Sequence, residues 1–336
     1  MPHFRPLVRF DLTRSPGALP LAGGAGWFCE LEALSRDAPP VVVPVDEAPQ
    51  AVLDRLTAPR PPIAGLAMDR PQIMGILNVT PDSFSDGGRF DAAETAHAHA
   101  AAMVAAGTGM LDIGGESTRP GAATVPEAEE IARTAPVIAA LRAAHAVPLS
   151  IDTRKAAVAA AALEAGAALV NDVSGFTHDT ELAPLCAARG VPVCVMHAQG
   201  DPATMQADPR YDDVLLDVYD FLEAQVAGLE RLGLARGRIL VDPGIGFGKT
   251  QAHNLALLNR LSLFHSLGCP ILLGVSRKRF IGTISGVAEA DRRVMGSVAV
   301  ALHGVSQGVQ LLRVHDVAET AQALALWQAV TRGAVS

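Results

Sequence analysis

The sequence is poor in cysteine, in aromatic residues and in charge. Its 336 residues include four cysteines, 4% aromatic residues and 18% charged residues. The cysteines lie far apart without CxxC or Cys/His ligand spacing, which argues against a zinc motif and predicts reduced thiols in a cytoplasmic protein. No apolar run reaches the ~18 residues that span a bilayer, and the opening MPHFRPLVRFDL lacks the apolar core of a signal peptide. We therefore expect a soluble protein with no membrane partner.

Positive charge is scarce as well. The formal net charge is −8 and no run of Lys and Arg marks a basic face, so we expect no nucleic-acid partner. An anionic ligand would have to be held by local cations rather than by the field of the whole protein. The hydrophobic fraction of 49% is normal for a globular enzyme and excludes a disordered chain.

The chain divides near residue 70. Residues 1–70 are rich in proline and contain no chemical motif; they show only a strand-like run over 41–45 and a short helical pattern over 47–56. We interpret them as an N-terminal extension, or a small cap packed against the main domain, and the sequence assigns them no role.

From Pro71 onward, apolar strand-like runs alternate with helical patterns. Eight runs are nearly continuous in apolar character, near residues 73–78, 109–114, 147–152, 167–171, 191–196, 238–242, 270–275 and 309–314. Helical patterns between them include 91–106, 126–144, 154–165, 211–232, 254–267 and 292–305. Such an alternation predicts parallel strands with right-handed crossovers. Because the repeating part is close to the ~250 residues of a (β/α)₈ TIM barrel, we predict that α/β fold over 71–336; a doubly wound open sheet is the alternative.

Polar residues occur where the predicted strands end. They are Asn78, Asp112, Asp152, Asn171, Asp242, Ser276 and Arg313. In a barrel the carboxyl ends of the strands converge on one rim, where this fold places its chemistry. The sequence therefore predicts one pocket built from several strand ends.

Two acids stand out on this rim, Asp152 in LSIDTRK and Asp242 in ILVDPGIGFGKT. A carboxylate at the end of an apolar strand is costly to bury without a donor, and either one alone could simply pair with a neighbouring Arg or N–H group. Together with Asn171 and Lys278, the two acids suit a flat heterocycle such as a 2-amino-4-oxo pyrimidine edge. A carboxylate can accept two parallel N–H bonds from such an edge.

Cations and flexible loops complete the predicted pocket. Arg313 and His315 in LLRVHD are two residues apart, so both leave the strand on one face, where they suit a phosphate or diphosphate; His315 alone could be a structural histidine. The loops at 80–88 (TPDSFSDGG) and 114–122 (GGESTRPGA) combine glycine hinges with polar residues and can close over a substrate.

One motif is misleading. The stretch GIGFGKT at 244–250 looks like a phosphate-binding P-loop, but Pro243 stands where G-x-x-x-x-G-K-[ST] requires its first glycine. We therefore expect no nucleotide binding here. His197 is expected to be a hydrogen-bonded support, and the sequence shows no His/Cys metal cluster.

Eight ordered motifs resemble those of the dihydropteroate synthase family: NVTPDSFSDGG, DIGGESTRPGA, SIDTRK, NDVSG, VMHAQG, DPGIGFGKT, GVSRKRFIG and RVHD. The resemblance covers essentially all of 71–336. It implies condensation of (7,8-dihydropterin-6-yl)methyl diphosphate with 4-aminobenzoate, which gives 7,8-dihydropteroate and diphosphate in folate biosynthesis. The alternatives are a pterin-binding paralogue without turnover and a pterin-dependent methyltransferase; the methyltransferases share the barrel and the pterin acids but lack the first two loops.

The resemblance also implies roles for residues of the rim. The pterin would be held by Asp152, Asn171, Asp242 and Lys278. Asn78 would bind the Mg²⁺ that accompanies the diphosphate, and Arg313 and His315 would contact the diphosphate oxygens.

Further roles fall on the two loops and on the second substrate. The resemblance implies that Thr118 and Arg119 of the second loop, with Asp86 of the first, close over the reacting centre as catalytic residues. The aminobenzoate pocket would comprise Phe247, Pro120 and Ser276, and Thr118 would also contact substrate. The family is a sulfonamide target, and the resemblance implies a homodimer.

Overall fold

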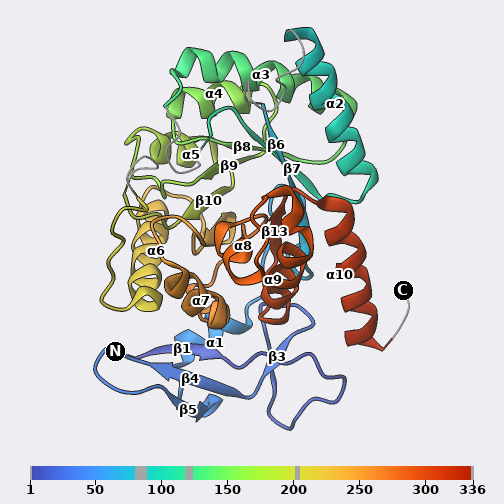
Figure 1. Ribbon diagram of the computed structural model, residues 1–336. Helices are drawn as coiled ribbons and strands as arrows, with labels where there is room; N and C mark the ends of the chain where they lie inside the picture. Colours follow the sequence, from blue (N-terminus) through green and yellow to red (C-terminus); the bar gives the residue numbers. More distant parts are fainter. Residues whose placement is uncertain (1, 80–88, 118–123, 201–204, 334–336) are drawn as a thin grey trace.

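The structure, a computed structural model, describes residues 2–79, 89–117, 124–200 and 205–333 (Figure 1). Its centre is a sheet of eight parallel strands in the order β11-β10-β9-β8-β7-β6-β13-β12. A parallel bridge between Val241 of β11 and Ile271, which directly precedes β12, closes the two ends of this order on each other. The predicted (β/α)₈ barrel is therefore confirmed, and the open-sheet alternative is wrong.

The eight strands occupy the apolar runs seen in the sequence. They are β6 (Gln72–Asn78), β7 (Met110–Gly114), β8 (Leu149–Asp152), β9 (Leu169–Asp172), β10 (Val193–Met196), β11 (Ile239–Asp242), β12 (Leu272–Leu273) and β13 (Leu311–Val314). Their apolar side chains are buried on both faces because helices cover the outside of the barrel.

Helices surround the sheet in Figure 1. They are α2 (Arg89–Ala105), α3 (Glu127–Ala144), α4 (Ala156–Glu164), α5 (Leu182–Arg189), α6 (Val214–Arg231), α7 (Gln251–Asn259), α8 (Arg279–Ser285), α9 (Val294–Ser306) and α10 (Val317–Arg332). The helix expected over 254–267 is divided into α7 and a 3₁₀ helix, η4 (Leu261–Leu267). At the break, Arg260 leaves the helical conformation, and its guanidinium donates two hydrogen bonds to Glu32 of the N-terminal extension.

The barrel interior has an apolar floor and a polar top. Near the amino ends of their strands, Met110, Leu169, Leu240 and Leu311 belong to one buried apolar cluster. Side chains alternate between the two faces of a strand, so the residue two positions later points inward as well. Those second residues are Asp112, Asn171, Asp242 and Arg313. On each of these four strands, the inward-facing apolar residue is therefore followed by an inward-facing polar residue at the carboxyl end of the barrel.

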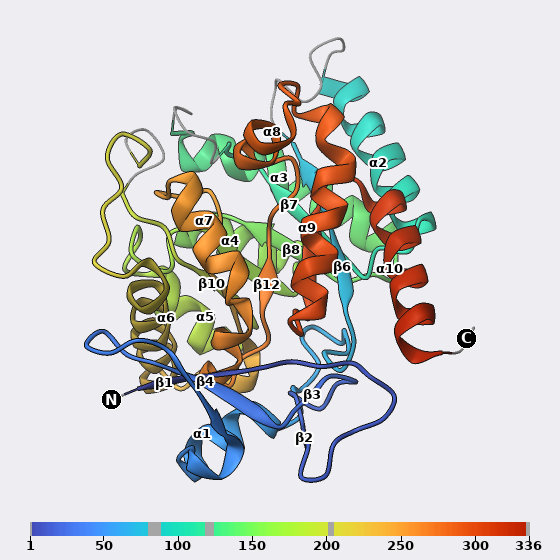
Figure 2. The same ribbon diagram turned by 60° about the horizontal axis from the view of Figure 1, so that its bottom comes forward.

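The N-terminal extension forms a small antiparallel sheet of β1 (His3–Pro6), β4 (Glu30–Leu34) and β5 (Val41–Pro44). A hairpin of β2 (Leu19–Pro20) and β3 (Trp27–Phe28), a 3₁₀ turn η1 (Val45–Glu47) and helix α1 (Gln50–Thr57) complete it. The strand expected at 41–45 and the helix expected at 47–56 correspond to β5 and α1. Figure 2 places these elements below the barrel, at the end opposite α8.

Contacts join the extension to the bottom of the barrel. Ile63 and Met68, 0% and 2% exposed, belong to the apolar floor together with residues of the barrel strands. The buried Arg60 donates from Nη2 to the carbonyl oxygen of His265 at 3.0 Å, and the Ser262 hydroxyl donates to the carbonyl oxygen of Pro6 at 2.9 Å. The extension therefore covers the end of the barrel that lies away from the polar rim.

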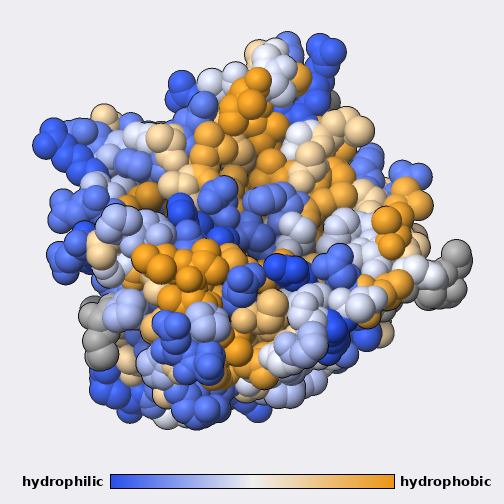
Figure 3. All heavy atoms as spheres, turned by 90° about the horizontal axis from the view of Figure 1, so that it is seen from below, coloured by the Kyte–Doolittle hydropathy of each residue, from blue (hydrophilic) through white to orange (hydrophobic). Residues whose placement is uncertain are grey.

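The surface at this lower end carries hydrophobic patches between hydrophilic side chains (Figure 3). Val41 and Val42 of the edge strand β5 are about half exposed. Within the described ranges, no helix combines the length and the apolar character needed to cross a membrane.

Candidate active site

A buried ion-pair cluster occupies the centre of the polar rim. Arg313 of β13 donates from Nε to Asp112 Oδ2 at 2.6 Å and from Nη2 to Asp152 Oδ2 at 2.7 Å. Asn171 of β9 donates from Nδ2 to the same Asp112 oxygen at 3.1 Å. Residues from four strands, 201 positions apart at the extremes, thus meet at one point. The predicted convergence of strand-end side chains on one rim is seen for these four residues.

The charges of this cluster control its protonation. Burial raises the pKa of Asp152 to about 7, against the opposing effect of Arg313, and the nearby Asp112 carboxylate raises it further. For Arg313, burial by itself would lower the pKa, but Asp112 and Asp152 raise it above its usual value. The guanidinium therefore stays charged, while Asp152 titrates close to neutral pH.

Two carboxylate oxygens in this cluster receive no hydrogen bond from the described residues. Within the described part of the chain, Asp112 Oδ1 and Asp152 Oδ1 are buried and have no hydrogen-bond partner. Leaving a buried acceptor unpaired costs about 1–3 kcal/mol, more for a charged group, and native proteins rarely do so without a reason. The cluster therefore has carboxylate acceptors that could bind the N–H groups of a ligand.

Asp242 and Lys278 form a second part of the rim. Asp242 Oδ1 accepts a hydrogen bond from the backbone N–H of Gly244 at 2.7 Å. Burial raises the pKa of Asp242 to about 6, while that N–H group and the ammonium of Lys278 oppose the rise. The Lys278 Nζ lies 4.0 Å from the centre of the Phe247 ring, a cation–π contact. An acid, an ammonium and an aromatic face thus lie close together.

Glycine makes this arrangement possible at one position. Gly246 has a φ of +84°, which few other residues adopt, and a Cβ built there would lie 3.2 Å from Lys278 Cδ. The Lys278 side chain therefore lies against the backbone of Gly246, next to Phe247.

Three described candidates remain: Ser276 and His315, which follow β12 and β13, and Asn78, which ends β6. The Ser276 hydroxyl oxygen accepts from the backbone N–H of His315 at 3.2 Å and lies 3.0 Å from His315 Nδ1. Asn78 ends β6 beside Gly114, where a Cβ would lie 3.4 Å from Asn78 Oδ1 and 3.8 Å from Asp152 Oδ2. The amide of Asn78 and the carboxylate of Asp152 therefore face the same small space.

Sequence reasoning gave Asp112 no role, although it noted the residue at a strand end. The structure makes it a fully buried partner of both Arg313 and Asn171. The available signal was its place two residues after the inward-facing Met110, but nothing in the sequence says which cation a carboxylate of β7 will meet.

Sequence reasoning also gave no role to Lys249, which lies in the stretch at 244–250 that resembles a P-loop. Its buried ammonium contacts three acceptors, His197 Nδ1 at 2.8 Å and the carbonyl oxygens of Phe247 and His197 at 3.0 and 3.2 Å. Burial lowers the pKa of Lys249 to about 7, and burial together with Lys249 lowers the pKa of His197 to about 2. The neutral histidine is thus an acceptor, which confirms His197 as a hydrogen-bonded support. Lys249 holds the backbone of Phe247 in place.

Four residues named in the sequence analysis lie outside the described residues: Asp86, Thr118, Arg119 and Pro120. Their roles stay predictions. Among the described residues, no group of three or more His, Cys, Asp or Glu side chains is arranged to hold a metal ion.

Comparison with known proteins supplies an independent line of evidence. A family model described as pterin binding enzyme matches residues 74–315. The dihydropteroate synthase of Escherichia coli (strain K12) is 45% identical over 256 residues, which cover 76% of this chain and 90% of that protein.

Solved structures agree with this comparison. A Xanthomonas albilineans dihydropteroate synthase with 4-aminobenzoic acid superimposes with a TM-score of 0.74 at 48% identity, covering 80% of this chain and 96% of the other. The enzyme of the same organism in complex with 7,8-dihydropteroate superimposes with a TM-score of 0.72 at 45% identity, covering 79% and 95%.

Proposed function

The chain belongs to the pterin-binding enzyme family as a dihydropteroate synthase, and from this premise we propose which residues of the rim carry the reaction. The enzyme is a transferase. It condenses (7,8-dihydropterin-6-yl)methyl diphosphate with 4-aminobenzoate and produces 7,8-dihydropteroate and diphosphate in folate biosynthesis. One observation carries our assignment most directly: Asp152 has one oxygen on Arg313 and one buried oxygen to which none of the described residues donates.

The pterin lies, in this proposal, among Asp152, Asn171, Asp242 and Lys278. The 2-amino and ring N–H groups of a pterin are adjacent donors, and a carboxylate is the acceptor that suits them. Asp152 Oδ1 is such an acceptor. Lys278 would donate to the pterin carbonyl, since its ammonium already lies beside Asp242 and Phe247. Asp112 supports this set by holding Asn171 and Arg313.

We assign the diphosphate to the side of the pocket near Asn78, Arg313 and His315. The two ion pairs of Arg313 use two of the five N–H donors of a guanidinium, so the group has further donors for an anion. His315 is fixed by Ser276, which orients its ring. The Arg313 guanidinium, together with a hydrogen bond from His315, would stabilise the negative charge that develops on the leaving diphosphate.

Mg²⁺ fits this side of the pocket. The amide oxygen of Asn78 is a hard ligand, and Mg²⁺ commonly keeps several waters and binds through one or two protein oxygens together with substrate phosphates. The lack of a carboxylate or histidine cluster among the described residues accords with such a substrate-dependent site. When bound, the ion would neutralise charge on the diphosphate oxygens.

The chemistry needs no enzyme nucleophile. The C–O bond between the pterin methylene and the diphosphate breaks, and its electron pair leaves with the diphosphate. The electron-rich pterin delocalises the resulting positive charge, and the arylamine nitrogen then forms the new C–N bond and releases a proton. The protein contributes orientation and electrostatic stabilisation. In this proposal Asp86, Thr118 and Arg119 act at the reacting centre, and Phe247, Ser276 and Pro120 contact the aminobenzoate.

We further propose that the enzyme is a cytoplasmic homodimer. The four cysteines are free and three of them are buried, with their pKa values raised by burial, which suits a reducing compartment. The dimer rests on the family resemblance. Sedimentation of the purified chain tests it directly.

Calorimetry with the pterin diphosphate tests the site assignment. Wild-type protein should bind it more tightly with Mg²⁺ than with EDTA, and Asn78→Ala should remove that difference. Retention of the full Mg²⁺ effect in Asn78→Ala would remove Asn78 from the metal site. Diphosphate release that depends on added 4-aminobenzoate distinguishes a synthase from a paralogue that only binds pterin.

A further inference from the structure

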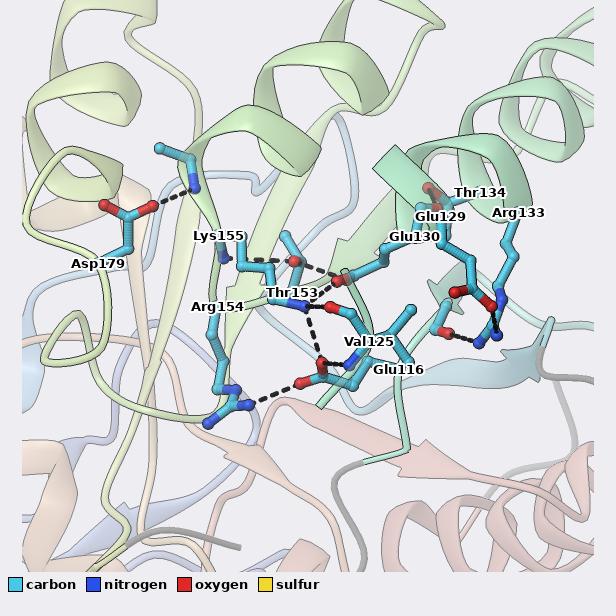
Figure 4. A network of polar contacts seen from close by, with 12 residues as sticks. Glu116, Val125, Glu129, Glu130, Arg133, Thr134, Thr153, Arg154, Lys155 and Asp179 are labelled. Carbon is cyan, nitrogen blue, oxygen red and sulfur yellow. Dashed lines mark hydrogen bonds and ion pairs between the residues drawn. The ribbon is translucent and has the colours of Figure 1, made fainter. Parts of the chain in front are cut away.

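A buried lysine outside the pocket ties three segments together. The Lys155 ammonium donates to Glu116 Oε2 at 2.7 Å, to Glu130 Oε2 at 2.6 Å and to the carbonyl oxygen of Val125 at 2.6 Å. In Figure 4 these three acceptors surround the ammonium. Its three N–H donors are therefore all satisfied, by the β7–α3 connection on one side and by helix α3 on the other.

Glu116 links the two described ends of the β7–α3 connection. It lies two residues after β7, and its Oε2 accepts from the backbone N–H of Val125, at the other end of the connection, at 2.8 Å. Its Oε1 accepts from Arg154 Nη2 at 2.6 Å. Val125 thus accepts a hydrogen bond from Lys155 at its carbonyl oxygen and donates one to Glu116 from its backbone N–H. These contacts fix the two described ends of the connection to each other.

The same network reaches the carboxylate assigned to the pterin. Thr153 directly follows Asp152; its hydroxyl donates to Glu130 Oε1 at 2.8 Å, and its backbone N–H donates to the carbonyl oxygen of Asn171 at 3.1 Å. The Lys155 backbone N–H in turn donates to the Thr153 hydroxyl oxygen at 3.3 Å. The end of β8 is therefore held in one position relative to the β7–α3 connection.

The network is buried and pairs opposite charges. Two carboxylates, Glu116 and Glu130, meet two cations, Arg154 and Lys155, and all four side chains are buried. Burial would raise the pKa of Glu116, but Lys155, the Val125 N–H and Arg154 lower it below its usual value. Removing one partner of such a set leaves an uncompensated buried charge, which is strongly destabilising at that place.

We propose that Lys155 is a positioning residue for the condensation: it holds both ends of the β7–α3 connection in register with Asp152. This inference rests on the proposed function, because the two predicted catalytic residues Thr118 and Arg119 belong to that connection. Asp152 has its own anchors in the barrel, namely Arg313 and the strand pairing of β8. Loss of Lys155 should therefore disturb turnover and aminobenzoate use more than pterin binding.

The test compares Lys155→Met and Glu116→Gln with wild type in the full chain. Glu116→Gln keeps the shape of the side chain, so it serves as the second variant should Lys155→Met fold poorly. A misplacement of about 1 Å can cost about 100-fold in rate, so kcat should fall by about tenfold or more and KM for 4-aminobenzoate should rise. The calorimetric Kd for the pterin diphosphate should stay close to the wild-type value in both variants.

Asp179→Asn is the matched structural control. Asp179 Oδ2 accepts from the Ala156 N–H at 2.7 Å, at the start of the same helix α4, and Figure 4 shows it on the side of that helix away from Glu116. It should lower Tm without the split between kcat and pterin Kd. The inference would be overturned if Asp179→Asn, at a Tm equal to that of the Lys155 and Glu116 variants, showed the same kinetic losses as they do. It would also be overturned if Lys155→Met and Glu116→Gln both had wild-type kinetics. A wild-type protein without turnover would overturn the proposed function, and this inference with it.

Discussion

Arg313 Nη2 lies 2.7 Å from Asp152 Oδ2, so the guanidinium of β13 is the buried counter-ion of the carboxylate that ends β8. Arg313 also binds Asp112, and Asp112 accepts from Asn171. A residue assigned to the diphosphate is thus in direct contact with a residue assigned to the pterin. Recognition of the two halves of this substrate is therefore coupled, and a change at Arg313 should alter the protonation of Asp152.

Asp152→Asn should weaken pterin binding by about 10- to 100-fold, because a hydrogen bond to a charged group contributes about 1.5–3 kcal/mol. The substitution turns one acceptor into a donor and removes one of the two anionic partners of Arg313. Calorimetry with the pterin diphosphate measures the loss. Ser150→Ala, a change on the same face of β8, is the control and should leave the affinity unchanged. An Asp152→Asn protein of wild-type affinity would remove Asp152 from the pterin site.

Pterin binding should depend on pH through Asp152. Because the pKa of its carboxyl is raised to about 7, affinity should increase as pH rises through about 7, where the acceptor becomes ionised. In Arg313→Ala the opposing cation is lost, so the pKa of Asp152 should rise further and the rise in affinity should move to higher pH. Arg313→Ala should also weaken binding of the pterin diphosphate more than it weakens binding of the corresponding pterin alcohol, which has no diphosphate. Unchanged kinetics and an unchanged pH profile would contradict the assignment of Arg313.

Asp242→Asn should stabilise the unliganded protein at alkaline pH. The pKa of Asp242 is raised from 3.8 to about 6 in the folded state. A carboxyl with a raised folded-state pKa contributes stability below its unfolded pKa and loses that contribution as pH rises through about 6. Thermal unfolding should therefore show a higher Tm for Asp242→Asn than for wild type at about pH 8, and a smaller difference at about pH 5.

Glu230→Gln provides the opposite control for that experiment. A hydrogen bond from Arg236 lowers the pKa of Glu230, so its ionised form contributes stability above the unfolded pKa, and this contribution is lost as pH falls. The glutamine variant should thus be less stable than wild type at alkaline pH. If Asp242→Asn changed Tm by the same amount at both pH values, the buried charge of Asp242 would not be what lowers the stability of the wild type at alkaline pH.

Ile63→Ala should destabilise the protein by about 2–5 kcal/mol, the usual cost of such a core truncation, without changing pterin affinity. Ile63 is fully buried in the apolar floor of the barrel, far along each strand from the polar rim. Urea unfolding measures the change, and Leu12→Ala, at an exposed position of the same extension, should be neutral. A neutral Ile63→Ala would show that the extension does not stabilise the barrel. A chain starting at Pro71 should lose the same contacts.

The sequence was sufficient for the barrel and its rim, because both follow from short-range patterns. Apolar strand runs alternating with helices specify the fold, and the two-residue period of a strand specifies which side chain points inward at each end. The pairings across the molecule could not be read in this way. Lys155 lies 39 residues from Glu116 and 25 from Glu130, and only the packing of β7, α3 and β8 brings them together. The contact of Lys249 with His197 was hidden for the same reason.

Formation of 7,8-dihydropteroate by the purified full chain tests the central claim most directly. Wild-type protein, supplied with the pterin diphosphate, 4-aminobenzoate and Mg²⁺, should form the product and release diphosphate in equal amounts, and Asp152→Asn should do so far more slowly. A wild-type protein that binds the pterin diphosphate but forms no 7,8-dihydropteroate would contradict the account.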